Sequence, residues 1–285
     1  IENGEMLRKL EVLDGGKNVL KPVAAPVSGF SSSIATRILD HLYAADIKGN
    51  VYNWSASREH WEEALQIFDA PEDEAGVTYR MDVGMINGDP WLFYQTGDME
   101  NLNYAESVFR IYALNTTEAI EGHPLTIDDL QELPPTGSTT STSNKGWYMN
   151  FEDDPLEIPS TPVTFYNGYL LFATFVESDD PCKNGDSKIY LVNARTGEGT
   201  WKNGKRFVRL SGLQISGITV FDDRVYLGVV GMAAQGDLPD ELGQDAVLAQ
   251  NLLSFKLPEE VPSSEGGGGG INPGLIFWKE WRDRQ

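Results

Sequence analysis

The stretch VTFYNGYLLFAT, residues 163–174, predicts a β-hairpin. Residues that favour strands (Val, Phe, Tyr and Leu) lie on both sides of Asn167 and Gly168. An Asn-Gly pair accepts the positive φ angles of a type I′ turn, a tight connection between antiparallel strands. The stretch therefore predicts two neighbouring strands of an antiparallel sheet.

The same pattern recurs along the chain. Aligning the second strand of each pair on one apolar residue gives separations of 50, 79 and 54 residues, and the longest interval contains the polar segment 116–146. A period of about 50 residues with about four strands per unit is typical of β-propeller blades. The other pairs lie at residues 23–46, 81–96 and 218–228, and the aligned residues are Tyr43, Phe93, Phe172 and Tyr226.

We therefore expect an all-β fold, a β-propeller with about four blades and a stray outer strand. The alternative is a β-sandwich with irregular hairpins. Residues 1–4 resemble the turn at 193–197, which we place between the third and fourth strands of a blade. On this interpretation Ile1 lies inside a blade, and residues 1–285 form the C-terminal part of a larger propeller.

Four segments depart from the strand pattern. Helical periodicity is predicted only at residues 57–68 and 126–133, where Thr126 is a candidate N-cap. Residues 116–146 are expected to form an inserted loop, flexible at 136–144. Residues 259–273 are expected to be a Gly-rich linker to a terminal strand at 274–281.

The composition excludes several classes of partner. The chain has 43 acidic and 22 basic residues, a net charge of −21, so phosphate backbones and anionic lipid surfaces are repelled. No apolar run reaches the roughly 18 residues of a membrane span. We expect no nucleic-acid partner and no membrane span.

The residue types used in catalysis show no catalytic spacing. His41, His60 and His123 lie in no metal-binding motif, and no Gly-x-Ser-x-Gly sequence occurs. Acidic neighbours disfavour a thiolate at Cys182, so we interpret this residue as a structural thiol or as half of a disulfide to a missing segment. These features predict that the chain is not an enzyme and has no cofactor.

Three segments are longer than blade geometry requires, and we interpret them as candidate recognition loops: 116–146, 178–188 and 231–244. Loops carry recognition when a rigid sheet framework holds them. Their candidate side chains are acidic or amide groups. These are Asp179, Asp180, Asn184, Asp186, Asp237 and Asp240.

Five motifs, in order, resemble the C-terminal β-propeller of PilY-type proteins, the type IV pilus tip-associated adhesin and biogenesis factors of bacteria. The segment LYAADIKGNVY is similar to the family's "vYaGDlxGNlW" strand, and GWYMNF to its "GWyxDL". The matching segments are 42–52, 91–97 with 107–112, 146–151, 161–182 and 277–280. The resemblance spans the chain.

The resemblance implies a secreted, cell-surface protein of the fimbrium, active in pilus biogenesis and cell adhesion. Its implied partners are minor pilins or other pilus subunits, a host or surface ligand, and an N-terminal part or second polypeptide that completes the propeller. The alternatives are a propeller enzyme, of the quinoprotein dehydrogenase or glycan-processing kind, and an adhesin unrelated to pili.

The family is calcium-binding, and its calcium loop precedes the "vYaGD" strand. The last position of that loop matches Asp40 here, but the earlier positions are Ser32, Ile34 and Thr36. Ile34 has no ligating atom, and calcium prefers several carboxylate oxygens. This departure predicts that the degenerate loop at Asp40 does not bind calcium.

Overall fold

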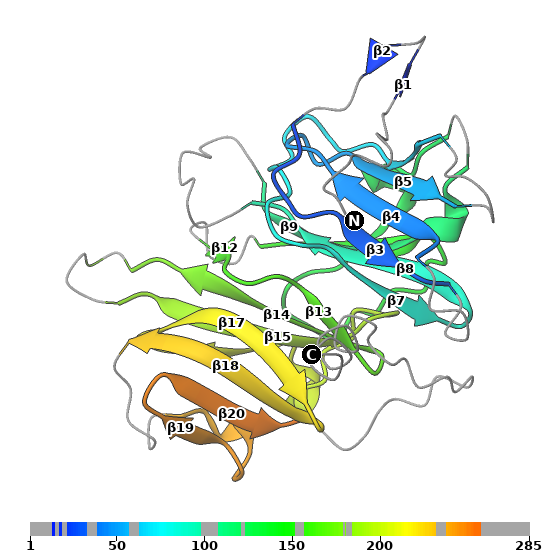
Figure 1. Cartoon of the computed structure of the whole chain (residues 1–285). Helices are drawn as coiled ribbons and strands as arrows, with labels where there is room; N and C mark the ends of the chain where they lie inside the picture. The colour runs from blue at the N-terminus through cyan, green and yellow to red at the C-terminus, as the bar shows by residue number, and fades with distance from the viewer. Residues whose placement is uncertain are drawn as a thin grey trace, which may run out of the picture.

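The computed structural model describes residues 13–14, 17–18, 22–32, 39–56, 63–97, 108–120, 123–151, 157–178, 180, 184–231 and 238–257. Within them the chain is all-β, as predicted, with four sheets of four or five strands (Figure 1). A separate two-stranded hairpin, β1 (Leu13–Asp14) and β2 (Lys17–Asn18), precedes them.

The four sheets follow one another in chain order. Sheet I contains β3 (Ser28–Phe30), β4 (His41–Ala45), β5 (Val51–Ser55) and β6 (Leu65–Phe68). Sheet II contains β7 (Asp82–Ile86), β8 (Asp89–Gln95), β9 (Arg110–Asn115), β11 (Gly146–Asn150) and the parallel edge strand β10 (Gln131–Glu132).

Sheet III contains β12 (Glu157–Pro159), β13 (Thr164–Tyr166), β14 (Tyr169–Val176), β15 (Asp186–Asn193) and β16 (Phe207–Leu210). Sheet IV contains β17 (Leu213–Phe221), β18 (Arg224–Gly231), β19 (Val247–Ala249) and β20 (Leu252–Lys256). The short 3-10 turns are η1 (Thr116–Glu118), η2 (Ile127–Asp129), η3 (Lys202–Gly204) and η5 (Asp240–Leu242).

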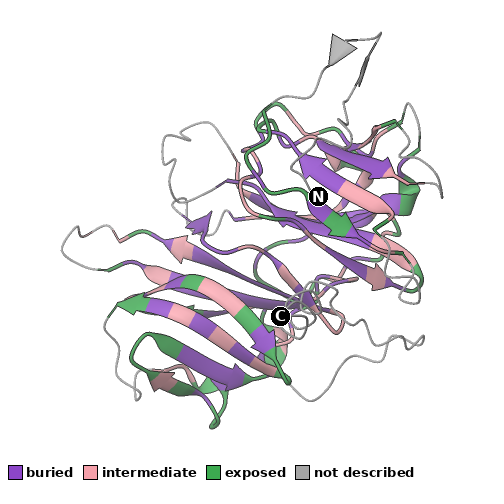
Figure 2. Ribbon diagram, in the orientation of Figure 1, coloured by how far each residue is buried: buried purple, intermediate pink, exposed green. Residues whose placement is uncertain are grey.

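Each sheet packs on the next through its apolar side chains. Sheets I and II share one buried cluster, sheets II and III a second, and sheets III and IV a third. Both faces of sheets II and III are consequently buried, which explains why their strands read as nearly continuous apolar runs. Figure 2 shows these strands largely buried, whereas buried and exposed residues alternate in sheet IV.

The predicted hairpin turns are confirmed. Asn167 and Gly168 have φ angles of 48° and 83°, as a type I′ turn requires, and the Asp222-Asp223 turn has 51° and 57°. The turn after β7 has two residues as well, since Asn87-Gly88 alone makes it and Pro90 already pairs with Met85 in the sheet.

Two sequence predictions are wrong. The helix expected at 57–68 is contradicted where the structure describes it, since Leu65–Phe68 is strand β6, paired with β5 and buried against sheet II at Phe68. The alignment on Phe172 is one residue off: Tyr43 and Phe93 face the following sheet, whereas Phe172 faces the preceding one and Leu171 is its correct equivalent.

The second predicted helix is reduced to one turn. Thr126 and Asp129 form a capping box around η2, and β10 follows at once. The turn expected at residues 1–4, the linker 259–273 and the terminal strand 274–281 lie outside the described residues. No helix among the described residues is long and apolar enough to cross a membrane.

Candidate functional site

The β4–β5, β8–β9 and β14–β15 connections leave their sheets at one end of the stack, which we call the long-loop end; their described residues are 46–50, 96–97, 108–109, 177–178, 180 and 184–185. The segments that connect one sheet to the next contact these connections at the same end. In the segment between sheets I and II, Gly76 O accepts from Gly97 N at 2.7 Å; in the segment between sheets III and IV, Gly212 N donates to Asp186 Oδ1 at 2.9 Å.

The described part of the β18–β19 connection, 238–246, lies toward the opposite end, because Arg224 Nη2 donates to Asp245 O at 2.6 Å and Lys205 contacts Glu241 at 2.8 Å. Of the three predicted recognition segments, 178–188 therefore belongs to the long-loop end, whereas the described residues 238–244 of segment 231–244 lie toward the opposite end.

A buried carboxylate lies beneath the loop of sheet II. Glu74 precedes β7 and accepts a hydrogen bond from Arg110 Nη1 at 2.7 Å, and Tyr112 Oη donates to the same oxygen. Arg110 also contacts Asp73 at 3.3 Å and donates from Nε to Asn150 Oδ1 at 2.9 Å. The Glu74 side chain is fully buried, so its charge is balanced inside the protein.

Sheet III repeats this arrangement. Glu157, on β12, accepts from Lys188 Nζ at 2.6 Å and from Tyr190 Oη at 2.8 Å. Thr174 Oγ1 donates to the same carboxylate at 2.5 Å, and Lys188 Nζ lies 4.6 Å from the centre of the Phe207 ring. Every polar atom of the cluster has a partner within the sheet, as a buried network requires.

The repeat is visible in the sequence of the third strands. Arg110-Ile-Tyr-Ala-Leu-Asn115 on β9 corresponds to Lys188-Ile-Tyr-Leu-Val-Asn193 on β15. In each case a basic residue and a tyrosine two positions later, on the same face of the strand, reach one carboxylate. This spacing is a signal that the sequence analysis missed.

Sheet I contains a reduced form of the cluster. Tyr52 Oη donates to Asp46 Oδ2 at 3.4 Å, and the other oxygen of Asp46 accepts from the backbone N–H groups of Lys48 and Asn50. Asp46 is fully buried, and the groups that donate to it in this turn are neutral: two backbone N–H groups, the Asn50 amide and the Tyr52 hydroxyl. Backbone donors stabilise its charge in place of a guanidinium or ammonium group.

Burial determines the protonation of these groups. Desolvation raises the pKa of Glu74 above its usual range, although Arg110 opposes the shift. Desolvation also raises the pKa of Tyr52 to about 12 and that of Tyr112 further. The tyrosines therefore remain neutral donors near neutral pH, which suits them to holding carboxylates in place.

The predicted loop residues have varied surroundings. Asp186 bonds Arg209 Nε at 2.7 Å with one oxygen and the Gly212 N–H with the other, so it joins β15 to the link before β17. Asn184 is exposed and reaches Gly212 O at 3.5 Å, and Asp180 N donates to Ser178 Oγ at 3.2 Å. Asp240 is exposed at the start of η5. Asp179, Asp237 and Cys182 lie outside the described residues.

The carboxylate of Asp40 is engaged by Ser32. The Ser32 N–H donates to Asp40 Oδ1 at 2.8 Å, and the Ser32 hydroxyl donates to Oδ2. Ile34 and Thr36 lie outside the described residues. Within the part of the chain that the structure describes, no three His, Cys, Asp or Glu side chains are grouped as metal ligands.

The histidines are scattered. His41 stacks on Tyr43 with ring centres 6.1 Å apart and meets Asn53 through Nδ1. His123 is exposed in a turn beside Ile120, and His60 lies outside the described residues.

The segment 116–146 lies at the opposite end of the stack, where the β9–β11 and β15–β16 connections meet. The Arg206 guanidinium, 2% exposed, donates to the backbone carbonyls of Pro134, Thr136, Gly137 and Thr139. Arg195 donates to Ser143 O at 2.6 Å. Charge-assisted hydrogen bonds thus join this segment to the β15–β16 connection of sheet III.

Comparison of the sequence with protein-family models and with curated proteins finds no match.

Proposed function

We propose that the chain is a non-enzymatic, extracellular β-propeller scaffold and adhesin, acting at the tip or in the priming complex of a type IV pilus-like filament. The resemblance to PilY-type proteins implies this role. The observation that supports it best is the stacking of four sheets in chain order, with connecting loops at both ends of the stack. Rigid sheets of this kind hold loops still for recognition.

The chemistry of the described residues supports a scaffold over an enzyme. The charged clusters at Glu74 and Glu157 are buried and paired within their own sheets. A carboxylate that substrate cannot reach does not act as a general acid or base. We therefore assign these clusters to holding the sheets beneath the loops.

The proposed partners are minor pilins on one end of the stack and a surface or host ligand on the other. An N-terminal part of the same protein, or a second polypeptide, supplies the further blades of the ring. The net charge of −21 keeps such an exported protein soluble through self-repulsion.

The test is a binding measurement against the purified minor pilins of the same source. Glu177→Lys reverses an exposed charge at the long-loop end, directly after β14, and Glu198→Lys reverses an exposed charge at the opposite end. We expect one minor pilin to bind, and Glu177→Lys to change its association rate several-fold while Glu198→Lys does not. Absence of binding to every minor pilin contradicts the proposal, as does a bound redox cofactor in the absorbance spectrum.

A further inference from the structure

Two buried oxygens beside the charged cluster of sheet II have no hydrogen-bond partner within the described residues. They are Glu74 Oε1 and Tyr94 Oη, and both side chains are fully buried. The other carboxylate oxygen of Glu74, Oε2, accepts from Arg110 and Tyr112. Buried polar atoms in folded proteins almost always have a partner, either from the chain or from ordered water. Both oxygens therefore require one.

The two oxygens lie close together. Tyr94 and Tyr112 are directly opposite each other on β8 and β9, and their rings stack with centres 5.0 Å apart at an angle of 20°. Their hydroxyls consequently project side by side, and that of Tyr112 contacts Glu74. Burial raises the pKa of Tyr94 and the charge of Glu74 raises it further, which places the carboxylate beside this hydroxyl as well.

The corresponding cluster of sheet III is complete. Phe172, directly opposite Tyr190, takes the place of Tyr94, and its ring stacks on Tyr190 with centres 4.6 Å apart. Both oxygens of Glu157 accept hydrogen bonds, one of them from Thr174. Sheet II therefore differs by one additional hydroxyl and by one carboxylate oxygen that the described chain does not reach. Both differences lie in the same part of the cluster.

The separation of these oxygens matches a single bridging molecule. Stacked rings 5.0 Å apart place their hydroxyls at a similar separation, and two hydrogen bonds through one water span up to about 5.5 Å. Thr96, the equivalent of Thr174, is a third neighbour: burial raises the pKa of Glu74, and the Thr96 hydroxyl is among the groups that oppose this shift. A buried water typically makes about three hydrogen bonds.

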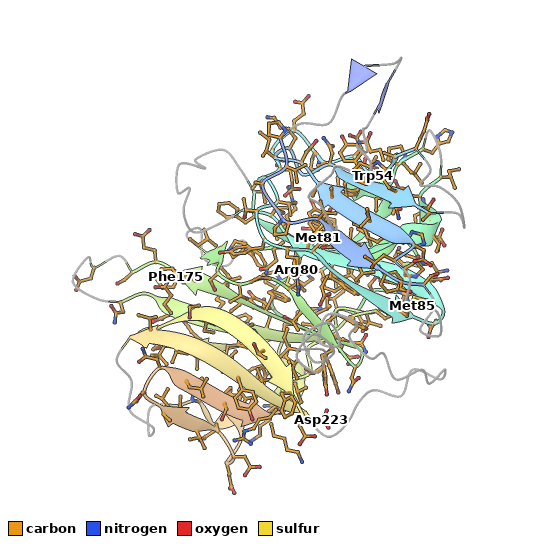
Figure 3. The ribbon with its side chains drawn as sticks, viewed as in Figure 1. Trp54, Arg80, Met81, Met85, Phe175 and Asp223 are labelled. Carbon is orange, nitrogen blue, oxygen red and sulfur yellow. The ribbon has the colours of Figure 1, made fainter. Side chains whose placement is uncertain are left out.

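The site is enclosed between sheets I and II. Tyr94 belongs to the apolar cluster that these two sheets share, and Figure 3 shows Met81, another member, among the side chains of this layer. On the side of sheet I, Gly49 of the β4–β5 connection packs on Glu74, since a Cβ atom at Gly49 would lie 2.7 Å from Glu74 Cγ. Only a very small molecule is compatible with such close packing.

We propose that one structural water is bound between Glu74 Oε1 and Tyr94 Oη, with Thr96 Oγ1 as its third neighbour. The water donates to the carboxylate and accepts from the tyrosine hydroxyl, which remains a neutral donor. A neutral molecule fits better than a cation, because Arg110 already balances the charge of Glu74 inside the protein. This assignment does not depend on the proposed pilus function.

A high-resolution crystal structure of the intact chain tests the assignment directly. We expect one ordered water within about 2.6–3.2 Å of both Glu74 Oε1 and Tyr94 Oη. A direct hydrogen bond between these two oxygens overturns the proposal, as does a site without ordered density. An ion with six or more oxygen neighbours at about 2.3–2.6 Å overturns it too, since these are calcium distances.

A double-mutant cycle measures whether the water couples the two residues. We expect the effects of Glu74→Gln and Tyr94→Phe on the folding equilibrium constant to deviate from additivity by about threefold or more in urea unfolding. Tyr190→Phe is the matched control, because its hydroxyl donates to Glu157 in sheet III at 2.8 Å. Its effect should add to that of Glu74→Gln. Additivity for both pairs, or equal coupling in both, overturns the proposal.

Discussion

Lys188 Nζ lies 2.6 Å from Glu157 Oε2, and the two side chains are 1% and 0% exposed. The pair therefore exists almost without water, and each charge depends on the other. Because Lys188 is on β15 and Glu157 on β12, the contact joins the third strand of sheet III to the segment that enters it from sheet II.

Replacing Lys188 by Met should lower the free energy of unfolding by about 3–5 kcal/mol, since it leaves the Glu157 carboxylate buried without its cation. Urea-induced unfolding at neutral pH measures the loss. The double variant Glu157→Gln/Lys188→Met should lose less than Lys188→Met, because no uncompensated charge remains.

The control for this prediction is Lys205→Met. Lys205 contacts Glu241 at 2.8 Å, but the two side chains are 55% and 25% exposed. Removing such a surface pair changes stability by about 1 kcal/mol or less. If Lys188→Met and Lys205→Met lower the free energy of unfolding equally, burial does not make the Lys188–Glu157 pair more important for stability than the exposed pair.

Replacing Arg206 by Met should release the strap 134–139. The buried guanidinium donates hydrogen bonds to four backbone carbonyls of that segment. Each carbonyl left buried without a donor lowers the free energy of unfolding by about 1–3 kcal/mol. We expect a loss above about 3 kcal/mol and faster thermolysin cleavage within the segment.

Arg209→Met is the matched control for Arg206. Its side chain is 43% exposed and pairs with Asp186 at the sheet surface. Removing it should cost about 1 kcal/mol or less and leave the cleavage rate of the strap unchanged. If Arg206→Met behaves in the same way, the strap does not depend on the guanidinium.

Stability should depend on pH through Glu74. Burial raises the folded-state pKa of Glu74 above the ordinary value of 4.5, so above pH 4.5 the native state holds a proton that the unfolded state has lost. This contribution is complete below pH 4.5 and is lost as the pH rises through the folded pKa. The free energy of wild type minus that of Glu74→Gln should therefore decrease as the pH rises.

Asp129→Asn should give the opposite sign. The hydrogen bond from Lys145 lowers the folded-state pKa of Asp129 below the ordinary value of 3.8. Its contribution is present above pH 3.8 and is lost as the pH falls through the folded pKa. Urea unfolding measured from about pH 3 to about pH 8 gives both stability differences. If the two differences change in the same direction with pH, the assignment is contradicted.

Calcium should not stabilise the protein. Both oxygens of Asp40 accept hydrogen bonds from Ser32, and Ile34 has no ligating atom. A ligand at a hundred times its Kd stabilises by about 2.7 kcal/mol, so a bound calcium would raise the Tm by several degrees. We expect melts in EDTA and in millimolar calcium to coincide, and a rise at sub-millimolar calcium would show a site.

The sequence predicts those parts of the fold that local chemistry determines. The Asn167-Gly168 and Asp222-Asp223 turns follow from residues that tolerate positive φ, and both lie where expected. The strand β6 does not follow, because Leu65–Phe68 matches a helical period and only its pairing with β5 makes it a strand. Tertiary pairing overrides local preference there.

The charged clusters depend on residues distant in sequence. Glu74 meets Arg110 across 36 positions, and Arg206 meets Thr139 across 67. No periodicity encodes such contacts, so the recognition residues proposed from loop length do not include them. The repeated Arg-Ile-Tyr and Lys-Ile-Tyr sequences at 110–112 and 188–190 are a local sequence signal of the clusters.

Gly84 tests the packing between sheets II and III. A Cβ atom at this position on β7 would lie 2.4 Å from the Phe165 ring, which itself stacks on Phe93 with ring centres 5.3 Å apart. Gly84→Ala should therefore cost about 1–3 kcal/mol through overpacking, and Phe165→Leu should restore part of it by removing the ring. Gly217→Ala, in open space on β17, is the control and should cost less than about 0.5 kcal/mol. If Gly84→Ala and Gly217→Ala lower the free energy of unfolding equally, Phe165 does not pack tightly against β7, and the close packing of sheets II and III described above is contradicted.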